Sequence, residues 1–239
     1  MVRIAVAVAT ADAMPNAFVV WRGIEESLEK AAQYGYDGIE LALKTPDQVD
    51  APALKRMLDD RGLACPCVST GQVFAGLGLY FTTRDKAKRT QVIDVFKGMI
   101  DIAAQFGAMV NIGRSRGFVE DDETIDDATV RFVDVAREIA AHAQSNDVRL
   151  ILEPVNRYEI NFINSVAEGA VLMERVGVPN MGLMPDLFHM NIEDRALGGE
   201  LEAHARHVSY IHFADSNRLA PGQGHTDFDA VFASLDRMQ

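Results

Sequence analysis

The segment Leu150-Ile151-Leu152-Glu153-Pro154, which continues as Val155-Asn156-Arg157-Tyr158-Glu159, gives the clearest indication of how this chain folds. The apolar residues before Glu153 predict a buried strand, and Pro154 ends its hydrogen-bond ladder because proline lacks an N–H group. A carboxylate directly after a buried strand is costly unless a metal, a proton or a partner compensates its charge. Glu153 is therefore the first candidate for a functional site.

The same pattern of an apolar run followed by a polar side chain occurs twice more. Residues 181–185 are followed by Asp186, and residues 208–211 are followed by His212. Glu153 alone could be a carboxylate bonded to loop amides, but the equivalent positions of Asp186 and His212 favour a ligand role. Three strand ends thus supply Glu, Asp and His, a set that binds divalent metals.

Apolar and amphipathic segments alternate along the rest of the chain. Helical connections of ten or more residues indicate parallel strands joined by crossovers. We expect loops at 69–83 and 113–122. Strands are expected at 4–9, 38–43, 63–68, 108–112, 148–152, 181–185 and 208–211, and helices at 25–34, 51–61, 85–106, 124–144, 165–176 and 227–238.

Two α/β architectures have parallel strands with helical crossovers. An open doubly wound sheet would carry a glycine-rich phosphate-binding turn after the first strand, where this chain has residues 10–13, TADA. A (β/α)8 TIM-type barrel is the better interpretation, because its functional residues gather at the C-terminal ends of the strands. We expect a single barrel domain over residues 1–239. The sequence shows no eighth βα unit, so either the barrel is open or the sequence given stops before that unit.

The composition is that of an ordinary globular protein. Of its 239 residues 48% are hydrophobic, and its net charge of −12 disfavours nucleic acid as a partner. No apolar run approaches the ~20 residues that span a bilayer, and a first strand explains residues 4–11 better than a secretory signal does. Cys65 and Cys67 are not expected to form a disulfide, which fits a reducing compartment. We expect a cytoplasmic protein that binds neither nucleic acid nor membranes.

Six motifs together resemble one known family. They lie at 36–41 (YDGIEL), 69–72 (STGQ), 153–159 (EPVNRYE), 186–191 (DLFHMN), 212–218 (HFADSNR) and 221–228 (PGQGHTDF). The chain resembles the sugar isomerase/epimerase family with the xylose isomerase-like barrel, in its ketose 3-epimerase and sugar phosphate isomerase/epimerase branch. The likeness runs along nearly the whole chain. It implies a TIM barrel, a small sugar substrate and a homo-oligomer.

The resemblance also implies roles for single residues. Glu153, Asp186 and His212 would bind the metal, and Glu153 would also transfer protons. Glu159, His189 and Arg218 would hold the sugar hydroxyls. Hard oxygen ligands with one imidazole suit Mn²⁺ first, and also Mg²⁺ or Co²⁺. The family's fourth ligand, a Glu of an eighth strand that is the second acid/base, cannot be assigned in this sequence.

These roles predict a metal-dependent isomerase or epimerase of a small ketose or related hydroxy-ketone, acting through an enediolate intermediate. Epimerisation needs a base on each face of the enediolate, whereas isomerisation moves a proton between adjacent carbons on one face. Two alternatives stay open. One is a non-catalytic or inactive truncated barrel, and the other is an endonuclease IV-like DNA-repair hydrolase, which would need several His ligands and a basic groove.

The substrate-binding candidates also have simpler interpretations. His189 can be a loop histidine with satisfied hydrogen bonds. Arg218 can be a surface arginine paired with Asp215 or Asp227. The motifs around them favour the sugar-binding role.

Several other side chains near the expected strand ends have no assigned role. Arg114 and Arg116 could touch a substrate phosphate or acid, but a solvated loop is the preferred interpretation. Glu40 is expected to brace the barrel or the ligands rather than to touch the metal. The apolar side chains of the loop after the third strand would line the pocket or an oligomer interface; they are Phe74, Leu77, Leu79, Tyr80 and Phe81.

Overall fold

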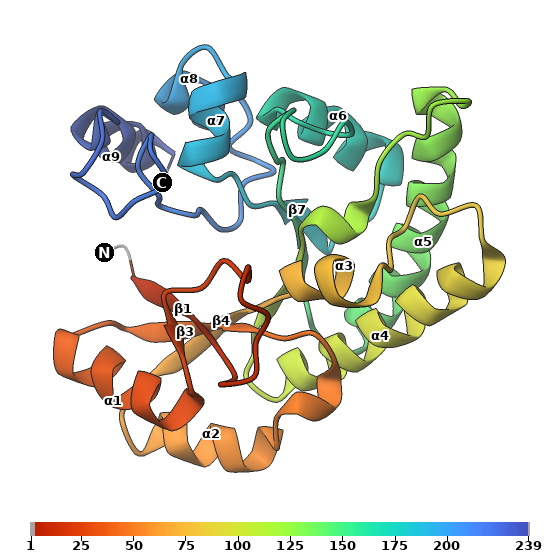
Figure 1. The fold of residues 1–239 in the computed structure, drawn as a ribbon. Coiled ribbons are helices and arrows are strands. Elements are labelled where there is room, and N and C mark those ends of the chain that lie inside the picture. Colours follow the sequence, from red (N-terminus) through yellow and green to blue (C-terminus); the bar gives the residue numbers. More distant parts are fainter. Residues whose placement is uncertain (1–2, 239) are drawn as a thin grey trace.

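A parallel sheet that curves into an incomplete barrel is the centre of the protein (Figure 1), as a computed structural model that describes residues 3–238 shows. The strand order is β2-β1-β3-β4-β5-β6-β7, and every pairing is parallel. The strands are β1 (Ala5–Ala9), β2 (Trp21–Arg22), β3 (Gly38–Ala42), β4 (Ala64–Ser69), β5 (Met109–Ile112), β6 (Leu150–Leu152) and β7 (Met181–Leu183).

Helices cover the outside of this sheet (Figure 1). The long helices begin at side-chain caps: Thr124 and Asp127 form a capping box at α5, and Asp85 accepts two backbone N–H groups at α4. The helices are α1 (Ile24–Tyr34), α2 (Ala51–Asp59), α3 (Gly71–Leu77), α4 (Lys86–Ala104), α5 (Ile125–Ser145), α6 (Val166–Val176), α7 (Leu187–Glu193), α8 (Leu197–Ala203) and α9 (Phe228–Arg237), with 3-10 turns η1 (Pro46–Gln48) and η2 (Arg114–Arg116).

The structure corrects two of the predicted elements and adds short elements that were not predicted. Residues 208–211 do not form a strand. Their segment makes only two isolated bridges, from Val208 to Leu183 and from His212 to Asp186, and pairs with no strand on its other side among residues 3–238. The predicted loop 69–83 contains α3, which is too short to show a helical period in the sequence. The short strand β2 and the helices α7 and α8 lie in segments without a predicted element.

The core explains why the strand ends are held in place. One large cluster of buried side chains fills the space between strands and helices, with Phe96 of α4 and Phe132 of α5 among its largest members. A smaller cluster of Cys67, Ile151 and Met184 lies apart from it. Ile151 and Glu153 are two residues apart, so they point to the same side of the sheet. Glu153 therefore projects to the side where this small cluster lies.

Two further predictions concern the cysteines and the apolar segments. Cys65 and Cys67 are both buried free thiols, as expected. Within residues 3–238, no helix is both long and apolar enough to cross a bilayer.

Candidate metal centre and active site

The three predicted metal ligands lie together at the C-terminal end of the sheet. Glu153 follows β6 directly, and Asp186 precedes α7 and bridges to His212 in parallel register. His212 Nδ1 is 3.1 Å from Glu153 Oε1 and 3.7 Å from Asp186 Oδ2. One potential ligand atom of each side chain lies within 4.8 Å of the other two. Residues far apart in the sequence thus converge on one small volume.

Local structure gives each carboxylate a fixed direction. Asp186 caps α7, since its Oδ1 accepts from the Phe188 N–H at 2.7 Å, and this leaves Oδ2 for the cluster. Pro154 follows Glu153, so the chain leaves the sheet directly after this carboxylate. Asn111 Nδ2 of β5 lies 3.4 Å from Glu153 Oε2. Asp186 is therefore held by the helix that it caps, and Glu153 by Asn111 of the neighbouring strand.

The electrostatics of the cluster favour negative carboxylates and a positive group between them. Burial opposes ionisation of Glu153, but the hydrogen bond and positive charge of His212 outweigh it and lower the pKa of Glu153. Burial also disfavours the charged form of His212, which by itself would lower the pKa of the ring. The charge of Glu40 and the hydrogen bonds with Asp186, Glu153 and Glu40 outweigh burial and raise this pKa well above its ordinary value. The carboxylates around His212 therefore stabilise a positive charge, which the ring itself carries when it is protonated.

Glu40 approaches the opposite side of the same imidazole. Its Oε2 lies 2.9 Å from His212 Nε2, and its side chain is 5% exposed. A ring whose Nε2–H donates to a carboxylate presents its Nδ1 lone pair to the other side. Glu40 thus supports the candidate ligand His212 from the side opposite the cluster. The motif at 36–41 alone could not show whether Glu40 would contact His212 or another part of the barrel interior.

The donor set fits a hard divalent cation. Two carboxylates and one imidazole are ligands that Mn²⁺, Mg²⁺ and Co²⁺ accept. Ligand atoms lie about 2.1 Å from a small cation, which places opposite ligands about 4.2 Å apart. The three atoms lie within 4.8 Å of one another, a limit that accommodates such a separation. The net charge of the two carboxylates also matches a divalent ion.

A second polar cluster contains the three predicted sugar-binding residues. Arg218 Nη1 donates to Glu159 Oε1 at 2.6 Å, and Asn156 Nδ2 donates to the same oxygen at 3.2 Å. Asn156 Nδ2 also lies 2.7 Å from His189 Nδ1. The simpler pairing of Arg218 with Asp215 or Asp227 is not what the structure shows. Asn156 links Glu159 to His189. It lies in the 153–159 motif but had no predicted role.

Two aromatic rings hold the Arg218 guanidinium. Its Cζ lies 3.8 Å from the centroid of Phe18 and 4.7 Å from that of Phe188. Phe18 comes from the segment between β1 and β2, and Phe188 from α7. Phe188 lies in the 186–191 motif without a predicted role, and no local pattern marked Phe18, because both rings act only through a residue distant in the chain.

Asp215 shapes the loop that carries Arg218. Its carboxylate accepts the backbone N–H groups of Ser216, Gly222, Gly224 and Thr226 at 2.7–3.1 Å. These hydrogen bonds outweigh burial and lower the pKa of Asp215. The 212–218 motif therefore holds Arg218 in position by folding its own loop around a buried carboxylate.

Arg116 overturns one expectation. It is fully buried rather than part of a solvated loop, and its guanidinium donates to the carbonyls of Glu153 at 2.8 Å, Phe162 at 2.6 Å and Ile163 at 3.0 Å. Burial lowers the pKa of Arg116 to about 10. A planar group with five donors can join several carbonyls of one loop, so Arg116 fixes the segment between Glu153 and α6 and is not free to bind a substrate phosphate. Arg114 lies over the ring of Phe74, 5.6 Å from its centroid.

Known proteins share this fold and much of this sequence. A family model described as a xylose isomerase-like TIM barrel matches residues 28–239. The ketose 3-epimerase of Arthrobacter globiformis is 29% identical over 224 residues, 90% of this chain and 74% of that protein. The L-ribulose 3-epimerase of Mesorhizobium japonicum is 29% identical over 215 residues, 89% of this chain and 71% of that protein.

A solved structure agrees in fold. The crystal structure of D-allulose 3-epimerase from Methylomonas sp. in complex with D-allulose has a TM-score of 0.81 at 25% identity, and the match covers 99% of this chain and 81% of that one. The prediction of a TIM-type barrel is confirmed. The chain belongs to the xylose isomerase-like TIM barrel family.

Proposed function

We propose that the chain is a metal-dependent sugar epimerase that acts on a small ketose or related hydroxy-ketone. The ketose and ribulose 3-epimerases among its relatives support the substrate class. The convergence of Glu153, Asp186 and His212 within 4.8 Å is the observation that carries the proposed chemistry. Mn²⁺ is the proposed cation, with Mg²⁺ or Co²⁺ as alternatives. In this proposal residues 1–239 belong to one barrel domain of a cytoplasmic protein, and the family resemblance implies a homo-oligomer.

Glu153 is the proposed base in this reaction. A bound divalent cation would polarise the substrate carbonyl and make the neighbouring C–H more acidic. Glu153 takes that proton and leaves an enediolate, and epimerisation is completed when a second acid protonates the opposite face. That second acid is expected to be a Glu of an eighth strand, and we assign it to no residue within 3–238.

The proposed hydroxyl-binding residues have complementary hydrogen-bonding capacity. Glu159 accepts from Arg218 and Asn156 through Oε1, and its other oxygen can accept from a hydroxyl. Asn156 donates to His189 Nδ1, so the proton of that ring is assigned to Nε2, which can donate to a hydroxyl. Acceptors and donors placed together in this way can orient a polyol chain and fix which C–H faces Glu153.

Proton exchange during turnover tests the proposal. The metal-free protein is titrated with Mn²⁺, and a panel of ketoses is then incubated with the loaded protein in D₂O. We expect an epimeric product with deuterium at the epimerised carbon. Glu153→Gln should reduce kcat by at least about a hundredfold, because it removes a general base. Absence of both Mn²⁺ binding and exchange would contradict the proposal and favour the non-catalytic barrel.

A DNA-repair hydrolase receives no support from the site. Within residues 3–238 the cluster offers one imidazole, where the endonuclease IV alternative needs several. The net charge of −12 also opposes a duplex substrate.

A further inference from the structure

An open cavity of about 670 Å³ adjoins the proposed sugar site at Glu159. Its lining comes from the loop after β5, the loop after β6 and Phe74 of α3, and does not include Glu153, Asp186 or His212. Pockets that bind small organic molecules have volumes of roughly 300–1,000 Å³. The cavity is therefore large enough for a group attached to a sugar that is bound at Glu159.

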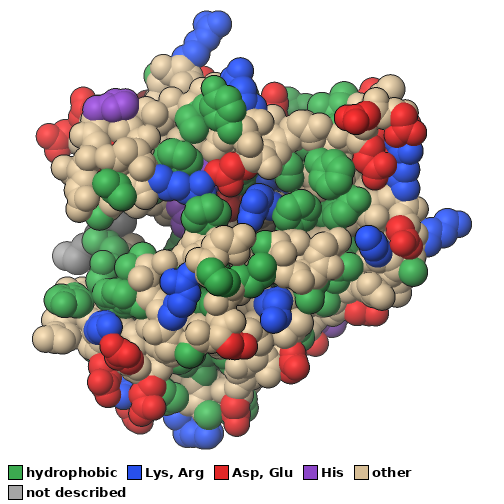
Figure 2. All heavy atoms as spheres, in the orientation of Figure 1, with side chains coloured by type: hydrophobic (Ala, Val, Ile, Leu, Met, Phe, Trp, Pro, Cys, Tyr) green, Lys and Arg blue, Asp and Glu red, His purple; other side chains and the backbone are tan. Residues whose placement is uncertain are grey.

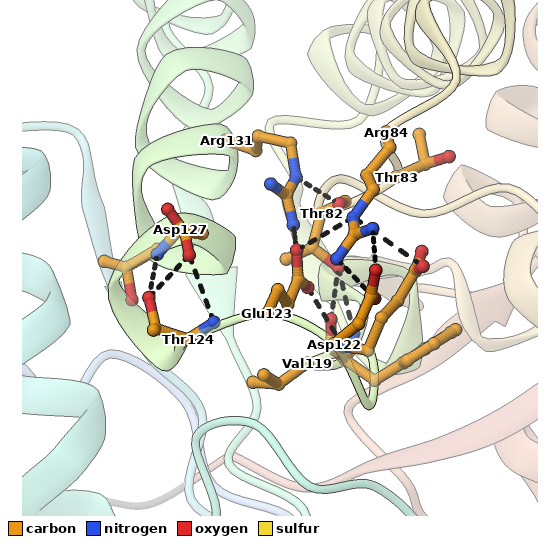
Figure 3. Close-up of polar contacts among 12 residues, drawn as sticks. Thr82, Thr83, Arg84, Val119, Asp122, Glu123, Thr124, Asp127 and Arg131 are labelled. Atoms are coloured by element: carbon orange, nitrogen blue, oxygen red, sulfur yellow. Dashed lines mark hydrogen bonds and ion pairs between the residues drawn. The ribbon is translucent and has the colours of Figure 1, made fainter.

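The wall formed by residues 118–123 is fixed by an ion-pair network (Figure 3). Arg84 binds Asp122 through two parallel hydrogen bonds of 2.7 and 2.9 Å, and its Nε donates to Glu123 at 3.2 Å. Arg131 of α5 donates to Glu123 and to the Thr82 carbonyl. Bidentate arginine pairs hold both partners in one geometry, so this wall is built in place rather than left as a free loop.

The two loops that flank the cavity are also joined to each other. Asn161 donates to the Val119 carbonyl at 2.9 Å and accepts from the Val119 N–H at 3.0 Å. Thr82 Oγ1 donates to the Phe118 carbonyl at 2.8 Å and accepts from the Phe118 N–H at 3.0 Å. Paired contacts of this kind set the width of the cavity and the position of the Phe118 ring.

The lining combines aromatic surface with acceptors. Phe74 and Phe118 both contact Tyr80, Phe74 edge-on with its ring centroid at 6.1 Å and Phe118 in a tilted arrangement at 4.8 Å. Both rings line the cavity together with Ile160. Carboxylates complete the lining; they belong to Glu120, Asp121, Asp122 and Glu159. Figure 2 shows acidic side chains gathered beside hydrophobic ones near the N-terminal end of α5. Aromatic rings cover apolar C–H faces, and ionised carboxylates accept hydrogen bonds from hydroxyls.

The charge of the lining selects against anions. None of the lining residues, all of which belong to the described part of the chain, is Lys or Arg. The nearby guanidiniums are engaged elsewhere, since Arg84 and Arg218 form ion pairs and Arg114 lies over the ring of Phe74. Arg84 and Arg218 thereby partly neutralise three of the lining carboxylates, those of Glu120, Asp122 and Glu159. A phosphate or carboxylate placed here would still meet a net negative charge, because the lining has four carboxylates against these two arginines. The cavity therefore suits a neutral group that carries many hydroxyls.

We propose that this cavity binds a glycosyl unit attached to the ketose, so that the preferred substrate is a glycosylated ketose rather than a free or phosphorylated one. This inference rests on the proposed epimerase function. The ketose portion occupies the site of Glu153 and Glu159, and the second ring lies on Phe118 with its hydroxyls toward the carboxylates.

Glucosyl-fructoses with glucose on O4, O5 or O6 (maltulose, leucrose and isomaltulose) provide the test, because each keeps a free C2 carbonyl and C3 hydroxyl. Epimerisation of each is compared with that of D-fructose and D-fructose 6-phosphate. We expect kcat/KM for at least one glucosyl-fructose to exceed that for D-fructose by about tenfold, as one or two added hydrogen bonds would give. The 6-phosphate should be poorer than D-fructose.

Two phenylalanine variants test whether the preference for the glucosyl-fructose arises in the cavity. Phe118→Ala should reduce the preference for the glucosyl-fructose to near unity. Phe232→Ala changes a 43% exposed phenylalanine of α9 that does not line the cavity, and should leave the preference unchanged. The inference is overturned if no glucosyl-fructose exceeds D-fructose, or if Phe118→Ala keeps the full preference.

Calorimetric binding to the Mn²⁺-loaded protein separates this inference from the proposed function. If no ketose is turned over, the proposed epimerase function fails. Tighter binding of a glucosyl-fructose than of D-fructose, lost in Phe118→Ala, would still support the cavity. Equal binding of the two sugars would overturn it.

Discussion

Among the single residues, the candidate ligand His212 has carboxylates on both sides of its ring. Glu40 holds Nε2 at 2.9 Å, while Glu153 and Asp186 face Nδ1. A carboxylate behind a metal-binding histidine fixes the tautomer and the ring orientation, and makes the ligand more basic. Glu40 is therefore a positioning residue, and its effect should appear in the affinity for metal even before any substrate is added.

We expect Glu40→Leu to raise the Kd for Mn²⁺ about 10–100-fold, the usual effect of removing such a partner. Glu40→Gln should raise it less, because the amide oxygen still accepts from Nε2–H. Calorimetric titration of the metal-free variants measures both values. Glu123→Gln, which changes a carboxylate with a 3% exposed side chain in the Arg84 network, is the control and should bind Mn²⁺ normally. Unchanged affinity in the Leu variant would show that His212 does not depend on Glu40.

Among the larger elements, the loop after β5 links the metal site to the cavity. Its first part, η2, contributes Arg116 to the loop that follows Glu153, and its later residues form the cavity wall. Gly117 joins the two parts with φ of 92° and ψ of −168°, a conformation that glycine alone adopts readily. A Cβ at this position would lie 2.0 Å from Thr82 Oγ1. The turn therefore requires glycine for both its backbone and its neighbours.

Substitution of two glycines separates these two requirements. Gly222 also has a positive φ, of 90°, but a Cβ added there would meet no atom within 4 Å. Gly222→Ala should therefore cost about 1–2 kcal/mol of stability, from backbone strain alone. Gly117→Ala should cost more, about 3 kcal/mol or above, because a steric overlap adds to the same kind of strain. Urea unfolding of both variants measures the free energies. Equal losses in the two variants would mean that the contact with Thr82 has no cost.

In the molecule as a whole, the proposed metal would join separate parts of the chain. Glu153 follows β6, Asp186 follows β7, and His212 lies in the next segment of the chain. Glu40 lies on β3, toward the other end of the strand order, and contacts His212. In the described residues the sheet ends at β2 and β7, and the segment 208–212 makes isolated bridges to Leu183 and Asp186. An ion held by these side chains binds the folded state only, so it should stabilise the molecule globally.

We therefore expect Mn²⁺ at about a hundred times its Kd to stabilise the protein by about 2.7 kcal/mol. In a chain of this size that corresponds to a rise in Tm of about 5–10 °C. Calorimetric scans with Mn²⁺ and with EDTA measure the difference. Asp186→Asn should remove most of the rise, whereas Asp126→Asn, at an exposed position of α5, should keep it. A Tm that does not respond to Mn²⁺ would contradict a shared cation site.

Local patterns in the sequence were enough to locate most elements and to identify the candidate ligands. A buried strand followed by a polar residue is such a pattern, so Glu153 and Asp186 could be found without coordinates, and His212 was found although its segment is not a strand. Hydrophobic periodicity likewise located most helices to within a few residues. These features depend on neighbours in the chain, which the sequence contains.

Which distant side chains meet became known only from the tertiary structure. Arg116 was predicted in solvent, but the fold buries it among carbonyls of another loop. The bond from Glu40 to His212, the rings around Arg218 and the cavity beside Glu159 likewise join segments from different strands. Such contacts depend on how the sheet curves and where its loops return, and no local pattern of residues records that geometry.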